Sequence, residues 1–316
     1  MRIHLSRNEN NSMDTIENLR AFLAVTEMGS FSAAARRGGL ATSVLTKRVN
    51  QLEHAIRTKL FIRTTRTVTL TEAGQRWIER ARSLVADIDD AMRQVSAAEQ
   101  ELEGPVRVKA PTTLTALYLG RTLTRFQTLH PKVFIELVLT DRVVNPSDER
   151  FDIAIAAFNA TFNNVVDVRL CPLRRQLCAA PEYLSARGMP EHPRDLLEHD
   201  TICFSPTGSI WSFTGPGGPA TIEINPRISA NDGQVLLRAA QAGNGIALLS
   251  EYLILPSLRS GKLVTVLADF APPEIWVKML IPEARTNIAR IRALVEFLKE
   301  EFTPSPPWLR EAKTVA

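Results

Sequence analysis

Apolar residues recur with a helical period in three consecutive segments near the start of the chain. The first segment runs from Asp14 to about Gly29. The second spans residues 33–37, and Ser30 before it can cap its N-terminus. The third runs from Thr42 to about Ile56. The pair Gly38–Gly39 separates the second segment from the third. Two short helices joined by a tight, glycine-containing turn are typical of a helix-turn-helix.

The third predicted helix has one apolar face and one polar face. Its apolar residues are spaced four, three and four apart, which predicts one buried stripe: Leu45, Val49, Leu52 and Ile56. The polar residues recur on the opposite side: Thr42, Ser43, Thr46, Lys47 and Asn50. After this helix, residues 59–70 form two short β-rich runs around a basic tip, which predicts a wing.

A longer helix is predicted from Thr71 onward. Its apolar residues follow a three-four rhythm typical of a coiled-coil seam: Ile78, Ala81, Val85, Ile88, Met92 and Val95. The seam is short for a coiled coil, so the helix could instead lie on its own domain. Charged residues surround the stripe, which favours pairing of two chains. Gly104–Pro105 then breaks the helix and marks a domain boundary.

From Val106 onward, predicted strands and helices alternate, which indicates α/β architecture with mostly parallel sheets. About 200 residues suffice for two lobes with a cleft between them. We therefore expect a disordered tail (1–12), a winged helix-turn-helix (13–71), a linker helix (72–103), a sensor domain (104–302) and a C-terminal tail (303–316). Within the sensor domain, lobe I is expected over about 105–180 and 265–302, and lobe II over about 181–264.

Positive charge is concentrated in the predicted helix-turn-helix and wing. The chain carries a net charge of +4, yet Arg36–Arg76 alone holds nine Lys or Arg against two acidic residues, a net of +7. Such a concentration is expected for binding a polyanion. Charge alone also fits RNA or an acidic membrane surface, so the fold must decide between them.

Composition narrows the class of protein further. Hydrophobic residues make up 45% of the chain, yet no apolar run is long enough to span a membrane, and the N-terminus lacks the apolar core of a secretory signal. We therefore expect a cytoplasmic protein. The three cysteines, Cys171, Cys178 and Cys203, do not suggest a disulfide framework. They are interpreted as small buried residues, with a redox-sensing pair as the alternative.

Residues 14–75 resemble the DNA-binding domain of LysR-type transcriptional regulators. The matching motifs are Leu19-x-x-Phe22, Gly29-Ser30-Phe31-Ser32-x-Ala34-Ala35, Leu52-Glu53, Leu60-Phe61-x-Arg63 and Leu70-Thr71-Glu72-Ala73-Gly74. Looser matches continue to about residue 302, among them Phe126-x-x-x-His130-Pro131, Phe151-Asp152-Ile153-Ala154-Ile155, Asn231-Asp232 and Ala242-Gly243-x-Gly245. Three positions depart from the family: Gly38 replaces its usual leucine, Arg57 its usual glycine and Thr42 its common glutamine.

The resemblance implies a winged helix-turn-helix, a long linker helix through which two chains dimerise, and a two-lobed sensor like a periplasmic binding protein. It also implies a homotetramer that binds double-stranded DNA under the control of a small-molecule effector. Together with the polar face, it makes Thr42, Ser43, Thr46 and Lys47 the candidates for reading base edges. Arg48 and Asn50 are expected at phosphates, and Arg63 and Arg66 in the adjacent minor groove.

The effector site is expected beyond the carboxyl ends of the sensor strands, where helix N-termini present free N–H groups. The candidates are Thr112, Thr113, Thr140, Asp141, Phe204, Ser205, Asn231 and Gly245. Because helix N-termini favour anions, a small carboxylate is the predicted effector class. The alternative is that Thr112 and Asn231 only cap their helices.

Other classes of protein explain less of the sequence. We find no nucleophile elbow, phosphate-binding glycine loop or Cys/His cluster with metal-ligand spacing, so no enzyme, cofactor or metal is predicted. A solute-binding protein leaves the basic module unexplained, and an architectural DNA-binding protein leaves the sensor half unexplained.

Overall fold

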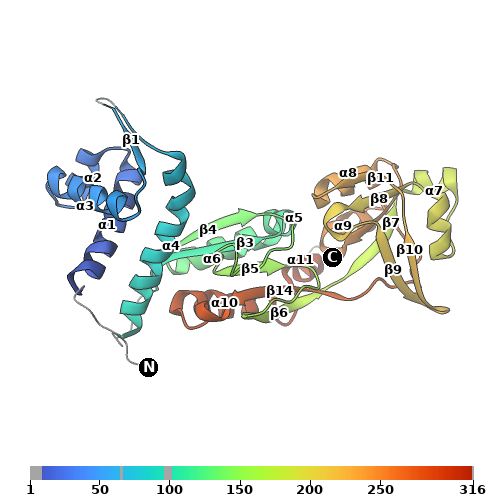
Figure 1. Cartoon of the computed structure of the whole chain (residues 1–316). Helices are drawn as coiled ribbons and strands as arrows, with labels where there is room; N and C mark the ends of the chain where they lie inside the picture. The colour runs from blue at the N-terminus through green and yellow to red at the C-terminus, as the bar shows by residue number, and fades with distance from the viewer. Residues whose placement is uncertain (1–8, 65–66, 96–101, 315–316) are drawn as a thin grey trace, which may run out of the picture. The chain divides into compact units, whose positions relative to one another are not determined.

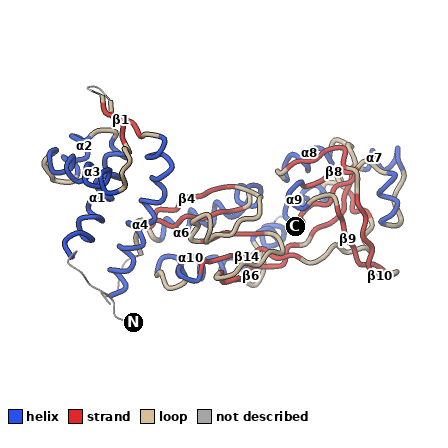
Figure 2. The backbone as a smooth tube through the Cα atoms, viewed as in Figure 1, coloured by secondary structure: helices blue, strands red, loops and turns tan. Residues whose placement is uncertain are grey.

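The computed structural model describes residues 9–64, 67–95 and 102–314. The chain divides into two units, residues 1–100 and 101–316. The first unit is largely helical, whereas the second alternates strands with helices (Figure 2).

The N-terminal unit contains the predicted helix-turn-helix, a β-hairpin wing and a long helix (Figure 1). Its described elements are α1 (Glu9–Met28), α2 (Phe31–Arg37), α3 (Thr42–Ala55), β1 (Phe61–Arg63), β2 (Val68–Leu70) and α4 (Glu72–Val95). Ser30 caps α2 by accepting a hydrogen bond from the amide of Ala33 at 3.4 Å. Gly39 turns the chain toward α3 with a φ of 63°, which glycine adopts without strain.

The first helix begins earlier than the sequence predicts. Residues 9–12 belong to the expected disordered tail, but α1 begins at Glu9 and includes them. A helix that is packed further along can extend into polar sequence, because each added residue gains a backbone hydrogen bond without needing an apolar side chain. Residues 1–8 lie outside the described residues.

A single apolar core joins α1, α2 and α3 to the wing and to α4. Phe22 of α1 is fully buried, and its ring lies 5.4 Å from that of Phe61 and 5.9 Å from that of Trp77. The predicted stripe of α3 enters this core, with Leu45, Val49 and Leu52 buried and Ile56 half-buried. Because aromatic rings from α1, the wing and α4 meet, the hairpin is held on the helices by packing.

The apolar stripe of α4 is used in part within its own unit. Ala81 is fully buried in the core, and Ile78 and Val85 pack against it. This is the alternative that the sequence left open for the first half of the helix. Further along, Ile88 is half-buried and Met92 is 67% exposed. The later part of the predicted seam is therefore the more exposed part.

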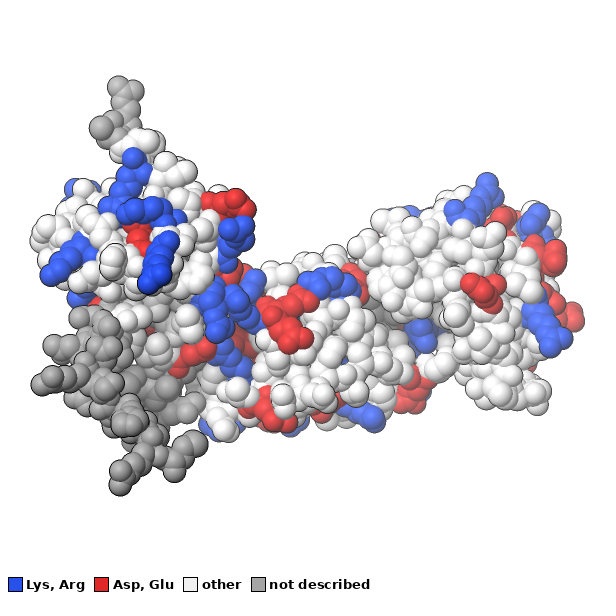
Figure 3. Space-filling model, viewed as in Figure 1, with Lys and Arg blue, Asp and Glu red and all other residues white. Residues whose placement is uncertain are grey.

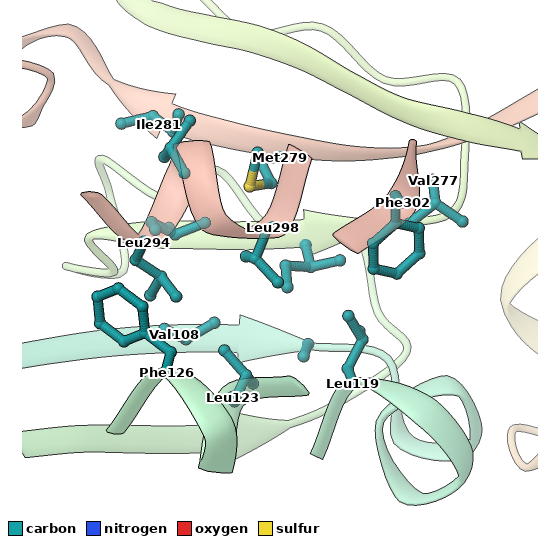
Figure 4. Close-up of a cluster of buried hydrophobic side chains, with 14 of the residues drawn as sticks. Val108, Leu119, Leu123, Phe126, Val277, Met279, Ile281, Leu294, Leu298 and Phe302 are labelled. Atoms are coloured by element: carbon teal, nitrogen blue, oxygen red, sulfur yellow. The ribbon is translucent and has the colours of Figure 1, made fainter. Parts of the chain in front are cut away.

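Lobe I of the second unit is a five-stranded sheet in the order β4-β3-β5-β14-β6. Its strands are β3 (Gly104–Ala110), β4 (Val133–Leu139), β5 (Ile153–Ala156), β6 (Val165–Leu173) and β14 (Ile275–Pro282). Its helical segments are α5 (Thr112–Leu114), the π-helical turn η1 (Thr115–Leu119), α6 (Gly120–Leu129), η4 (Glu283–Arg285) and α10 (Ala289–Phe302). Figure 4 shows Val108 and Met279 of the sheet meeting side chains of α6 and α10, among them Phe126 and Leu294.

Lobe II is a second five-stranded sheet in the order β11-β8-β12-β7-β13. Its strands are β7 (Arg175–Ala179), β8 (Thr201–Phe204), β11 (Pro226–Ala230), β12 (Ile246–Ser250) and β13 (Val264–Val266), with a separate hairpin of β9 (Ile210–Gly215) and β10 (Gly218–Glu223). Its helical segments are α7 (Pro181–Arg187), η2 (Pro193–Glu198), η3 (Ser205–Thr207), α8 (Gly233–Gln241) and α9 (Glu251–Arg259).

Two expectations about the sheets are corrected. In each five-stranded sheet two strand pairings are parallel and two antiparallel, so the sheets are mixed rather than mostly parallel. The boundary of lobe I also moves, because β7 pairs with β12 and β13 and so places residues 175–179 in lobe II. The reason is that the chain changes lobes directly between β6 and β7, and single-strand patterns do not reveal pairing partners.

The C-terminal segment is not the tail that the sequence predicts. Residues Pro307–Thr314 form helix α11, and Trp308 is only 2% exposed. Its ring lies 5.6 Å from both Tyr118 of lobe I and Tyr252 of lobe II. The segment folds because one large aromatic side chain packs against two other aromatic rings, and local sequence does not disclose contacts over that distance.

Candidate DNA-binding surface and effector site

The polar face of α3 forms a shallow groove on the surface of the N-terminal unit. The groove is lined by Thr15, Asn18, Thr42, Ser43, Thr46, Lys47, Asn50, Gln51, His54 and Ala55. All five residues of the predicted polar face are therefore in it, and the apolar stripe of the same helix is turned into the core. A helix with one side packed and the other side polar and exposed can be offered to the major groove of DNA.

Two residues of this face have defined donor and acceptor properties. The hydroxyl of Thr46 donates to the carbonyl oxygen of Thr42 at 2.8 Å, so Thr46 offers its methyl group and oxygen lone pairs to a partner. Lys47 is exposed one residue further along. Its ammonium group can donate to the acceptors of guanine, whereas a threonine methyl group suits the methyl group of thymine.

The two residues predicted at phosphates have partners within the protein. Arg48 pairs with Glu17 of α1 at 2.9 Å and is half-buried. Asn50 accepts a hydrogen bond from Arg63 through its side-chain oxygen at 2.8 Å, which leaves its amide N–H groups for another partner. Arg48 thus connects α3 to α1, and Asn50 connects α3 to the wing.

The wing is an antiparallel hairpin in which Phe61 pairs with Leu70 and Arg63 with Val68. Thr64 closes it toward the tip, where its amide donates to the carbonyl oxygen of Thr67 at 2.9 Å. Arg66, a predicted minor-groove residue, lies outside the described residues. Arg63 is described, and its guanidinium lies 4.5 Å from the centre of the Phe31 ring while it donates to Asn50.

Glu53 fixes the wing to α3. Its carboxylate, only 3% exposed, accepts hydrogen bonds from the amides of Leu60 at 2.9 Å and Phe61 at 3.2 Å. Lys59 adds an ion pair at 2.8 Å. Burial by itself would raise the pKa of Glu53, but these hydrogen bonds outweigh it and hold the pKa below its ordinary value. The motifs Leu52-Glu53 and Leu60-Phe61-x-Arg63 therefore describe one buried contact.

The sequence interpretation missed two polar residues of α3 that belong to this surface. Gln51 and His54 line the same groove as Lys47. They lie four and seven residues after Lys47, so helical spacing alone would have placed them on the polar face. Figure 3 shows several Lys and Arg side chains gathered on one face of the same unit.

Seven of the eight candidate effector residues lie at the carboxyl ends of two sets of parallel strands. In lobe I, β3 and β4 run in register from Gly104 and Val133 to Ala110 and Leu139. Thr112, Thr113, Thr140 and Asp141 therefore follow the strands at one edge. In lobe II, Ala230 of β11 pairs with Phe204 of β8, so Phe204, Ser205 and Asn231 share one edge as well.

One polar contact joins these two edges. The hydroxyl of Thr113, in lobe I, donates to Asp232 of lobe II at 3.1 Å and accepts a hydrogen bond from the amide of Gly233 at 3.0 Å. Thr113 is 5% exposed. Both roles of one hydroxyl are thus used to hold the start of α8 against the start of α5.

Two family descriptions match the chain. Residues 16–75 match "Bacterial regulatory helix-turn-helix protein, lysR family", and residues 99–303 match "LysR substrate binding domain". The chain belongs to the LysR family of transcriptional regulators. It is accordingly a DNA-binding transcriptional regulator with a C-terminal domain for a small-molecule effector.

Individual relatives match nearly the whole length of the regulator. It is 30% identical over 292 residues to the HTH-type transcriptional activator TtdR of Escherichia coli strain K12, covering 91% of the chain and 94% of TtdR. It is similar to the solved structure of CrgA, a LysR-type transcriptional regulator from Neisseria meningitidis, with 27% identity, a TM-score of 0.58, and coverage of 91% and 98%. The full-length structure of the Vibrio cholerae virulence activator AphB shares the fold, at 23% identity and a TM-score of 0.58, covering 90% and 98%.

Carboxylates of the regulator accept hydrogen bonds at the N-termini of α5 and α8. Asp141 accepts a hydrogen bond from the amide of Thr112 at 3.3 Å, and Asp232 accepts from the amides of Gln234 and Val235 at 2.9 and 3.1 Å. The first three N–H groups of α8 are therefore taken, because the amide of Gly233 donates to Thr113, and the first N–H group of α5 is taken as well. The N-cap residues are Pro111 for α5 and Asp232 for α8, rather than Thr112 and Asn231.

Gly245 does not belong with the other effector candidates. Ile246 pairs with Thr201 at the start of the parallel strands β12 and β8, so Gly245 lies at their amino ends, opposite Phe204 and Ser205. A Cβ atom on Gly245 would lie 2.4 Å from the carbonyl oxygen of Asp200. The glycine is needed for this close backbone approach, and strand direction places it at the wrong edge for the site.

The three cysteines are buried and have no disulfide among the described residues. Burial raises the pKa values of Cys171 and Cys178 to about 12. A buried, protonated thiol is a poor nucleophile, which favours the structural interpretation over a redox pair. Among the described residues, no group of His, Cys, Asp and Glu could hold a metal ion, and no helix is long and apolar enough to cross a membrane.

Proposed function

We propose that the regulator reads a specific duplex sequence with the polar face of α3 and secures itself on DNA with the wing. Thr42, Ser43, Thr46 and Lys47 contact base edges, and Arg48 and Asn50 lie nearer the phosphates. Arg63 and Arg66 contact the adjacent minor groove. The proposal is supported chiefly by the packing of α3, which turns its apolar stripe inward and leaves its whole polar face in an open groove.

Arg63 acts in this proposal through two properties. Its guanidinium holds Asn50 and stacks on Phe31, so it keeps the wing at a fixed angle to the reading helix. It also adds positive charge beside the groove, where each arginine or lysine strengthens binding to any sequence. Both properties support binding in general rather than discrimination between bases.

The assembly and the effector are part of the same proposal. Two chains pair through the later part of α4, where Met92 is exposed, and two such pairs form a homotetramer. The effector is a small carboxylate that binds at the carboxyl edges of the two lobes, beside the contact between Thr113 and Asp232. The chain regulates transcription rather than catalysing a reaction, in keeping with its relatives, and works in the cytoplasm, where bacterial DNA lies.

The division between reading and anchoring residues is testable with two single variants. A preferred duplex is first selected from a random pool by the full-length protein, and binding to it and to random duplex is measured by fluorescence anisotropy at fixed salt. Lys47→Ala should weaken binding to the selected duplex by about 1–3 kcal/mol and leave random duplex nearly unchanged. Arg63→Ala should weaken both.

Lys262→Ala is the matched control, because Lys262 is an exposed lysine of lobe II far along the chain from α3. Its binding to both duplexes should equal that of the unsubstituted protein. The proposal fails if the protein ignores duplex DNA at low ionic strength, or if Lys47→Ala and Arg63→Ala change both duplexes alike.

A further inference from the structure

Lys109 is a buried lysine without a hydrogen-bond acceptor among the described residues. The residue is 1% exposed, and its ammonium nitrogen lies 5.5 Å from the centre of the Phe158 ring. Lys278, on the neighbouring part of the same sheet, is also buried but donates to the carbonyl oxygen of Ala160 and to Asp167. Of these two buried lysines, Lys278 is satisfied by the protein and Lys109 is not.

The position of Lys109 is the carboxyl edge of the parallel strands in lobe I. Lys109 is the second-last residue of β3 and pairs with Val138 of β4 and Ala154 of β5. Figure 1 shows β3 and β4 ending near α5. Ligands of α/β sheets bind beyond this edge. Phe158 and Asp141 follow β5 and β4 there, and both are half-buried.

The charges around Lys109 do not neutralise it directly. Arg142 pairs with Glu149, and the carboxylate of Asp141, which also accepts a hydrogen bond from the amide of Thr112, favours the charged form of Lys109 without forming an ion pair with it. Burial lowers the pKa of Lys109 to about 8, so most molecules still carry the ammonium charge at neutral pH. An ammonium group on a residue that is 1% exposed, without a protein acceptor among the described residues, is poorly solvated, and an oxyanion is the group that best satisfies it.

We propose that the ammonium group of Lys109 binds the carboxylate of the effector, with the ring of Phe158 against the carbon skeleton. This inference rests on the proposed effector function and names the group that recognises the anion. It takes the place of the N-terminus of α8, whose first three N–H groups already have acceptors within the protein. A bound carboxylate accepts hydrogen bonds from Lys109 and stabilises its charged form.

The test is a thermal-shift titration of the full-length protein with named anions: acetate, succinate, L-malate, L-tartrate, benzoate and inorganic phosphate. At neutral pH at least one carboxylate should raise Tm by about 2–4 °C or more. The same carboxylate should lose most of this effect about two pH units above the pKa of Lys109, where the lysine is neutral.

Two lysine variants separate this site from a general effect of anions. Lys109→Met should fold, because it removes a buried charge, and should no longer respond to the carboxylate; Lys109→Gln should respond no better. Lys278→Met is the matched control, since it removes the other buried lysine of the same sheet, and it should keep the response. Equal responses of Lys109→Met and the unsubstituted protein, or no response to any carboxylate, overturn the inference, as does stabilisation by phosphate alone.

DNA binding distinguishes this failure from failure of the proposed function. Without added anion, Lys109→Met should bind the selected duplex as tightly as the unsubstituted protein. If duplex binding persists while the carboxylate response is absent, only the assignment of Lys109 as the carboxylate-binding group is rejected. If the unsubstituted protein fails to bind duplex DNA, the proposed function falls, whatever the anions do.

Discussion

At the scale of single residues, the backbone of Arg57 is strained. Arg57 follows α3 with a left-handed φ of 52°. Its amide donates to the carbonyl oxygen of His54 at 3.1 Å, and the amide of Thr58 donates to that of Glu53 at 3.0 Å, which together form a Schellman motif. Glycine is the residue that this motif favours, and it is the family's usual residue at the position.

Arg57→Gly should therefore raise the free energy of unfolding by up to about 1 kcal/mol, because it removes the crowding of Cβ in the left-handed conformation. Urea unfolding of the full-length protein measures the change. Arg57→Ala is the control, since it removes the same charge but keeps the Cβ atom, and it should give no gain. Equal stabilisation by both variants would point to the charge instead of the backbone.

At the scale of elements, the angle of the wing depends on the buried carboxylate of Glu53. Hydrogen bonds from Leu60, Phe61 and Lys59 reach one side chain of α3, so the hairpin and the reading helix move as one piece. Packing of Phe61 against Phe22 supports the same geometry. A change at Glu53 should therefore affect both stability and DNA binding.

Glu53→Gln should lower the free energy of unfolding by about 1–3 kcal/mol, because an amide replaces a charged acceptor of several donors. The folded pKa of Glu53 lies below its ordinary value of 4.5, so its contribution is fully present above that value and is lost as pH falls through the folded pKa. Urea unfolding from pH 7 downward should thus show a smaller difference between variant and unsubstituted protein in acid. Glu72→Gln, at an exposed position, is the control. A constant difference at all pH values would contradict this account.

At the scale of the whole effector domain, aromatic packing by the C-terminal segment connects the two lobes. Trp308 contacts Tyr118 of lobe I and Tyr252 of lobe II, and Phe302 lies 6.0 Å away. The hydroxyl of Tyr118 also donates to the carbonyl oxygen of Tyr252 at 3.3 Å. Residues that the sequence assigns to a tail thus stabilise the relation between the lobes.

Trp308→Ala should lower the free energy of unfolding by about 3–5 kcal/mol, the usual cost of removing a large buried aromatic side chain. Trp308→Phe should retain most of the stability, because it keeps a ring in the same pocket. Chemical unfolding followed by circular dichroism compares the variants. A protein shortened after residue 302 that unfolds like the full-length chain would establish the segment as a tail after all.

The residues of the site were predicted unevenly, for a physical reason. The polar face of α3 follows from helical spacing, which is local, so Thr42 to Asn50 were found and even the missed Gln51 and His54 carried the signal. The placement of Gly245 and the free N-terminus of α8 were wrong, because the first depends on strand direction and the second on the side chains of Asp232 and Thr113. Lys109 gave no signal, since a lysine in a strand usually faces solvent.

The sequence by itself determined the local elements and the class of protein, because hydrophobic period, turn residues and charge act over neighbouring positions. It predicted the helix-turn-helix, the wing and the family resemblance that the comparisons then confirmed. Tertiary structure alone decided the lobe to which β7 belongs, the packing of Trp308 and the burial of Lys109 without an acceptor. Each of these depends on contacts between residues far apart in the chain, and no local pattern records which distant groups will meet.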